Sequence, residues 1–180
     1  LVAEIDPKDA QMIELNVLRS PDREEYTRIV FMKDKGFSSG LDYAAGEGTA
    51  LMPDDLVSLV TGKPTGPRKR RTQESLIMIE SSNSSILPDV SYRPPEVAPF
   101  QLNPGEKVNL RIFIDKSILE VFVNGKQCVA MRVYPGKDDS TGVSIRSRGK
   151  DALLTSLDAY QMKNIWDLPA DAWSAQKSWR

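Results

Sequence analysis

Two carboxylates that flank one tight turn are the side chains of this sequence best placed to do chemistry. Asp115 opens the turn, and Glu120 lies in the segment that follows it. Two neighbouring acidic groups can serve as a nucleophile and as a general acid or base. A turn-forming aspartate, and a strand glutamate that accepts from a nearby lysine or arginine, explain the same residues without catalysis. We therefore expect both to be structural and assign no catalytic residue.

The absence of histidine excludes several kinds of active site. The 180 residues contain none, so serine–histidine–aspartate catalysis, cysteine–histidine catalysis and histidine-ligated zinc are ruled out. Asp138-Asp139-Ser140 offers oxygen ligands but lacks the glycine-containing loop of a typical calcium site. We predict no metal site and no cofactor. The single cysteine, Cys128, cannot form an internal disulfide, and its place in a strand predicts a small buried hydrophobic side chain.

Charge and hydropathy argue against nucleic acid and membranes as partners. A net charge of −1 provides no field that would attract nucleic acid or acidic lipid. No apolar run approaches the ~20 residues that cross a bilayer. The basic run Arg68–Arg71 is open to three interpretations: a protease-processing site, a nucleic-acid patch, or a solvated loop. Because the run is short and the rest of the chain is neutral, we expect a solvated loop.

The strands that carry the two carboxylates are predicted most clearly between residues 110 and 134. Apolar residues alternate with others at the start of this stretch, which indicates a strand with one buried face. Asp115-Lys116-Ser117 forms the first turn and Asn124-Gly125 the second, because asparagine and glycine accept the positive φ of a type I′ turn. The predicted antiparallel strands are 110–114, 118–123 and 128–134.

Short strands separated by turns fill most of the remaining chain. We expect them at 1–5, 12–19, 25–32, 76–80, 142–146 and 152–162. A glycine- and proline-rich stretch, 34–74, interrupts the pattern as an irregular insertion. The composition, 40% hydrophobic and 27% charged, is ordinary for a domain with its own core. We predict an all-β fold, a two-sheet antiparallel β-sandwich of jelly-roll or concanavalin-like form, with one module over 1–166 and a C-terminal tail over 167–180.

Several of these segments together form a longer pattern. It runs from an Asp-basic-Ser turn, through a strand with an inward glutamate and an Asn-Gly turn, to strands that end in Arg-Val-Tyr-Pro and Ile-Trp. Its residues here are Asp115-Lys116-Ser117, Glu120, Asn124-Gly125, Arg132-Val133-Tyr134-Pro135 and Ile165-Trp166, with further matches at Ile5-Asp6-Pro7, 85–90, Arg93-Pro94-Pro95 and 102–106. The pattern resembles the C-terminal β-sandwich module of glycoside hydrolase family 32, the family of invertases, inulinases and levanases. The resemblance covers 1–33 and 75–166.

The resemblance implies that the bond-breaking groups lie elsewhere in a larger protein. In the family, an aspartate nucleophile and a glutamate acid/base, ~5–5.5 Å apart in a retaining mechanism, belong to motifs of the type Trp-Met-Asn-Asp-Pro-Asn-Gly, Arg-Asp-Pro and Glu-Cys. None of these occurs here. Because the chain starts at Leu1 inside a predicted strand, we expect a fragment or a processed chain whose N-terminal part is missing. The resemblance implies that a five-bladed catalytic β-propeller occupies that part. The parent would hydrolyse fructosyl bonds of sucrose or fructans, and the resemblance favours a secreted or periplasmic location over a cytoplasmic one.

Large aromatic residues are the candidates for contact with that propeller. Tyr92, Trp166, Trp173 and Trp179 each combine a large apolar body with a polar tip, as interface residues do. Core filling explains Trp166 at least as well. The alternative function is a stand-alone carbohydrate-binding module, because β-sandwiches bind glycans through exposed aromatic residues. At 7% of the residues, aromatic side chains are not abundant, and no loop clusters them.

Overall fold

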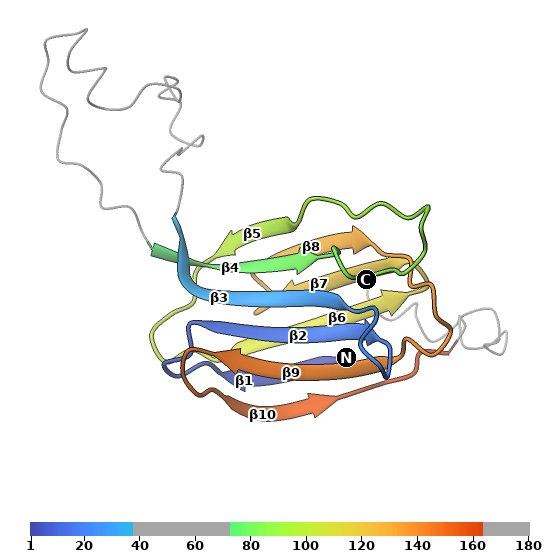
Figure 1. Cartoon of the computed structure of the whole chain (residues 1–180). Coiled ribbons are helices and arrows are strands. Elements are labelled where there is room, and N and C mark those ends of the chain that lie inside the picture. The colour runs from blue at the N-terminus through green and yellow to red at the C-terminus, as the bar shows by residue number, and fades with distance from the viewer. Residues whose placement is uncertain (38–72, 164–180) are drawn as a thin grey trace, which may run out of the picture.

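Two five-stranded antiparallel sheets form the molecule (Figure 1). The computed structural model describes residues 1–37 and 73–163. Sheet A has the order β10-β1-β6-β7-β8 and sheet B the order β5-β4-β3-β2-β9. The strands are β1 (Val2–Asp6), β2 (Met12–Arg19), β3 (Thr27–Phe37), β4 (Gln73–Glu80), β5 (Glu96–Phe100), β6 (Val108–Asp115), β7 (Ile118–Val123), β8 (Gln127–Arg132), β9 (Gly142–Arg148) and β10 (Leu153–Asp158). The predicted all-β sandwich is confirmed.

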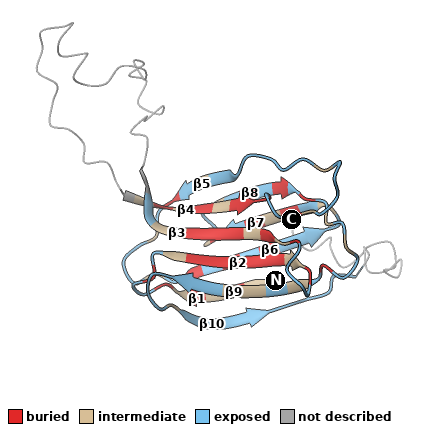
Figure 2. Ribbon diagram, in the orientation of Figure 1, coloured by how far each residue is buried: buried red, intermediate tan, exposed pale blue. Residues whose placement is uncertain are grey.

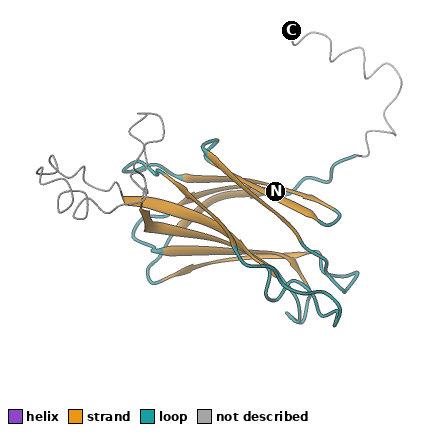
Figure 3. Cartoon of the chain, turned by 90° about the horizontal axis from the view of Figure 1, so that it is seen from above, coloured by secondary structure: helices purple, strands orange, loops and turns teal. Residues whose placement is uncertain are grey.

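The two sheets stack as layers, and the loops gather at the ends of the strands (Figure 3). Successive side chains of a strand point to opposite faces, so each sheet offers one inner and one outer face. The inner faces supply the core, and buried residues of the strands are red in Figure 2. Its largest members are Ile5, Leu15, Ile29, Phe31, Ile77, Ile79, Ile112 and Leu119, each 0–1% exposed. Fully burying one such side chain stabilises the fold by about 1.5–3 kcal/mol.

The meander of β6, β7 and β8 has the register that the alternation predicts. Ile112 lies opposite Val121, and Val121 lies opposite Val129. All three side chains point into the core. Glu120, between two core residues of β7, therefore points to the outer face of sheet A and is half-buried. The expectation of an inward glutamate is wrong, because the period of two places Leu119 and Val121 inward and the residue between them outward.

Both predicted turns of the meander are present. Asn124 and Gly125 have φ angles of 52° and 62°, the positive values that a type I′ turn needs. A bond of 2.9 Å from the Lys126 amide to the Val123 carbonyl closes this hairpin. In the other turn, Lys116 adopts a φ of 52°. The side-chain amide of Asn124 also donates to Glu106 at 2.8 Å. This hydrogen bond connects the Asn124-Gly125 turn to the loop before β6.

The predicted insertion is shorter at both ends than expected. Gly36 pairs with Glu74 and Phe37 pairs with Gln73, so the first and last residues of the 34–74 segment extend β3 and β4. The stretch between these pairs, including Arg68–Arg71, lies outside the described residues, as does the tail 167–180. The closing strand is also shorter than predicted, since β10 covers Leu153–Asp158 only. Within the described ranges, no helix is long and apolar enough to cross a membrane.

Candidate functional site

The two carboxylates of the β6–β7 hairpin occupy an open surface. Phe113 lies opposite Glu120 and Asp115 opposite Ile118, so the acidic residues sit in different cross-strand pairs on the outer face of sheet A. Asp115 is exposed at the end of β6. Neither residue lines the two cavities described below. A glycosidase needs its carboxylates on either side of an enclosed scissile bond, and this surface does not provide that arrangement.

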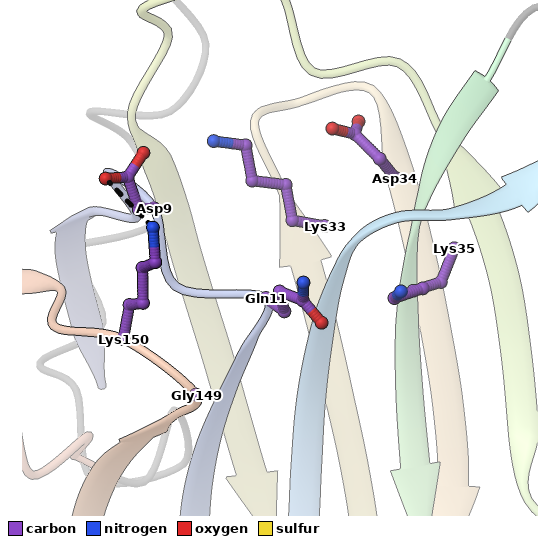
Figure 4. Close-up of a pocket in the computed structure, with 7 residues that line it drawn as sticks. All are labelled: Asp9, Gln11, Lys33, Asp34, Lys35, Gly149 and Lys150. Carbon is purple, nitrogen blue, oxygen red and sulfur yellow. Dashed lines mark ion pairs between the residues drawn. The ribbon is translucent and has the colours of Figure 1, made fainter.

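A polar cavity of about 550 Å³ lies between the start of β2, the later half of β3 and the β9–β10 turn (Figure 4). Its lining residues are Asp9, Gln11, Lys33, Asp34, Lys35, Gly149 and Lys150. Lys150 approaches Asp9 at 3.8 Å, and the Lys33 ammonium donates to the Lys8 carbonyl at 2.5 Å. None of these lining residues is aromatic, so this cavity offers no stacking platform for a sugar ring. It is a solvated, charged recess.

A second, smaller cavity of about 60 Å³ contains one of the predicted interface residues. Tyr92 lines it together with Tyr134, Arg93, Arg132 and several serines. Tyr92 is 71% exposed and Tyr134 is 42% exposed. Sequence reasoning identified Tyr92 and missed Tyr134, which is the last residue of the third predicted strand and lies just beyond β8 in the structure. The other predicted interface residues, Trp166, Trp173 and Trp179, lie outside the described part of the chain.

Buried Glu25 joins three loops. Its carboxylate accepts from the amides of Gly136 and Lys137, each at 2.8 Å, from the Ile86 amide at 3.1 Å, and from the Ser140 hydroxyl. Burial opposes the negative charge, but these donors outweigh it and hold the pKa of Glu25 below its ordinary value. Ser140, a residue of the Asp138-Asp139-Ser140 stretch, is thus buried in a structural contact with Glu25.

Buried Glu14 is surrounded by arginines on the outer face of sheet B. Its carboxylate lies 2.6 Å from Arg146, 3.2 Å from Arg28 and 3.3 Å from Arg148. Burial alone would raise the pKa of Glu14; the hydrogen bond from Arg146 and the charge of Arg28 reverse this, so that the pKa is lowered. Arg28 also reaches Glu80 at 3.2 Å. Both carboxylates are therefore neutralised within the sheet.

Cys128 differs from its prediction. It lies opposite Phe122 on the outer face of sheet A and is exposed, because the core positions of β8 belong to Val129 and Met131. Partial burial and the nearby Glu120 raise the pKa of its thiol, so it is not an activated nucleophile. Among the residues that the structure describes, no three histidine, cysteine, aspartate or glutamate side chains form a group that could hold a metal ion.

Comparison with known proteins identifies the family. The family model described as "Glycosyl hydrolases family 32 C terminal" matches residues 1–161. Among solved structures, an exo-inulinase from Aspergillus awamori matches with a TM-score of 0.52 and 16% identity, over 84% of this chain and 23% of that one. This likeness shows a shared fold, and the chain spans less than a quarter of the exo-inulinase's length. No curated protein sequence matches. The chain belongs to glycoside hydrolase family 32, as a module of its C-terminal type.

Proposed function

We propose that the chain is the non-catalytic C-terminal β-sandwich module of a β-fructosidase-type glycoside hydrolase. The parent enzyme hydrolyses fructosyl bonds of sucrose or fructans, and the module packs against an N-terminal catalytic β-propeller and stabilises it. The match of residues 1–161 to the C-terminal family model carries this proposal. The described acidic groups support it, because the buried Glu14, Glu25 and Glu80 are engaged in structural contacts and the hairpin pair lies on an open face.

Fructose release tests the proposal directly. The isolated chain, mixed with sucrose, inulin or levan, is expected to release no fructose above a buffer control, because it holds no enclosed pair of carboxylates among its described residues. The parent enzyme is expected to release fructose from at least one of the three. Turnover by the isolated chain that survives repeated purification would reject the non-catalytic assignment.

Carbohydrate binding remains a second candidate because one observation favours it. Tyr92, Tyr134 and Arg132 line the same small cavity, and exposed aromatic faces beside a hydrogen-bond donor can hold a sugar. Titration calorimetry of the chain with fructo-oligosaccharides tests this function. Binding that Tyr92→Ala removes would support it, whereas no heat from any of these sugars would exclude it.

A further inference from the structure

The outer face of sheet A carries three large apolar side chains. Phe113 and Phe122 form an edge-to-face pair with ring centroids 5.8 Å apart. They are 40% and 38% exposed, and Ile118 on the same face is 41% exposed. We call Phe113, Ile118 and Phe122 the outer apolar patch. Apolar side chains that lie together on an outer sheet face are typical of a surface that contacts another protein.

Four charged residues frame this patch. Arg111 lies opposite Phe122, Glu120 opposite Phe113, and Ile118 lies between Asp115 and Arg132. None of the four charged side chains forms an ion pair with another described residue. Two positive and two negative groups around an apolar centre can pair with a complementary surface and determine how it docks.

The outer face of sheet B differs in this respect. Its central carboxylate, Glu14, is saturated by Arg28, Arg146 and Arg148, and Glu80 binds the first of these. Charges that are already paired within a sheet gain little from a new partner, because pairing elsewhere would first break the existing contacts. The framing charges on the outer face of sheet A, by contrast, have no ion-pair partner among the described residues and remain available to a docking surface.

The start of the chain lies beside the outer apolar patch. The Leu1 ammonium donates to the Ile112 carbonyl, and the Ile112 amide donates to the Leu1 carbonyl, both at 2.8 Å. Leu1 is thus the neighbour of the residue that precedes Phe113. Ile112 and Ile114 both lie on the inner face of β6, but Ile112 is 1% exposed and Ile114 is 38% exposed. The buried core therefore ends next to Leu1. In the proposed parent enzyme, the preceding polypeptide joins the sandwich at this point.

We propose that the outer apolar patch, with its frame of Arg111, Asp115, Glu120 and Arg132, is the surface that docks on the catalytic domain of the parent enzyme. This inference rests on the function proposed above. The catalytic domain is attached next to the patch, so its effective concentration there exceeds that of a second copy of the module. The two phenylalanines enter an apolar recess of that domain, and the framing residues pair with charges around it.

Cys128 provides a built-in probe of this contact. It is the only cysteine of the chain, it is exposed, and it lies opposite Phe122. Iodoacetamide at about pH 9, where enough thiolate forms despite the raised pKa, is expected to alkylate it readily in the isolated chain. In the intact parent enzyme the rate is expected to fall at least about tenfold, because docking leaves the thiol reactive only during local opening. Peptide mass spectrometry distinguishes Cys128 from other cysteines of the parent.

A matched probe on the other sheet controls for the size of the parent. Val97, on β5 of sheet B, is 48% exposed and alternates with core-facing Phe100 and Ala98. Val97→Cys in a Cys128→Ala background is expected to label at the same rate in the isolated chain and in the parent. Phe122→Asp is expected to leave the isolated chain folded, by circular dichroism, and to restore Cys128 labelling in the parent.

Three results would overturn the docking proposal. Equal Cys128 rates in the isolated chain and the parent would show that the face stays open. Protection of Val97→Cys instead of Cys128 would place the contact on sheet B. Protection of Cys128 in the isolated chain that increases with protein concentration would identify a second copy as the partner. Fructose release by the isolated chain would instead reject the non-catalytic function, whatever the labelling shows.

Discussion

At the residue scale, the buried carboxylates form hydrogen bonds that connect segments far apart in the sequence. Glu25 follows the β2–β3 turn, and its oxygens accept from the loop before β5 and from the loop after β8. The Ser20 amide, at the other side of the same turn, donates to the Glu25 carbonyl at 2.9 Å. One side chain thus holds together loops that the two sheets by themselves would leave independent.

Glu25→Gln is expected to lower the free energy of unfolding by about 2–4 kcal/mol, because a buried amide loses the charge and presents a donor to backbone donors. Urea unfolding at neutral pH measures the change. The control is Glu24→Gln, whose exposed carboxylate pairs with Lys137 at 2.6 Å and which is expected to cost about 0–1 kcal/mol. Equal effects of the two substitutions would contradict the view that the hydrogen bonds of Glu25 to the two loops stabilise the fold.

The contribution of Glu25 to the free energy of unfolding is expected to depend on pH. The pKa of Glu25 is lowered in the folded protein from an ordinary value of 4.5. Its stabilisation is therefore complete above that value and is lost as the pH falls through the folded pKa. Urea unfolding at about pH 6 and about pH 3.5 is expected to show a steeper loss for the natural chain than for Glu25→Gln. Parallel losses would show that other carboxylates carry the acid sensitivity.

Residue types were easier to predict than residue roles. The exclusion of histidine chemistry needs the composition alone. The roles of Glu14 and Glu25 were missed because their partners, Arg146 and Gly136, are more than a hundred positions away along the chain. Cys128 lies in the predicted strand but is exposed and not buried, because the alternation gives the core positions of β8 to Val129 and Met131.

At the element scale, alternation of apolar and polar residues predicted the strands and the turns between them. The β7 strand shows why this works: Leu119, Val121 and Val123 are 0% exposed, while the residues between them face outward. A shift of the register by one residue would exchange the two sets, so burial of one face selects a single register. Asn124-Gly125 reinforces the selection, because its backbone twist matches that of the flanking strands.

A pair of neighbouring substitutions separates the two faces of β7. Leu119→Ala is expected to lower the free energy of unfolding by about 2–5 kcal/mol, because it leaves a cavity between the sheets. Ile118→Ala, one position earlier and 41% exposed, is expected to cost about 0.5–1 kcal/mol in the isolated chain. Chemical denaturation of both variants measures the difference. A larger effect at Ile118 would invert the assignment of the inner and outer faces.

Strand ends were less predictable than strand centres. β3 and β4 continue to Phe37 and Gln73, into the segment predicted to be irregular. Glycine in a strand interior weakens the sequence signal, and here Gly36 continues the pairing because a partner strand supplies its hydrogen bonds. The local composition indicates a loop at these positions, and the tertiary contact makes them strand.

At the scale of the whole molecule, the two sheets share one core. Ile13 and Ile79 of sheet B and Ile5 and Val121 of sheet A belong to the same cluster of buried residues. Neither sheet can keep its inner face dry alone, so we expect the sandwich to unfold as one cooperative unit. Calorimetric and van't Hoff enthalpies of the isolated chain should agree. Two resolved transitions within the sandwich would show that the sheets are independently stable.

The β class, the meander, its two turns and the family pattern can be predicted from the amino-acid sequence alone, because they depend on the period of two and on residues close together in the chain. The order of the strands, in which β1 lies between β6 and β10, and the contacts of Glu25 with distant loops follow from the tertiary structure. It also decided that Phe113 and Phe122 meet on an outer face. Such contacts join residues far apart in the chain, or select one face of a sheet, and both depend on how the whole chain packs its inner faces together.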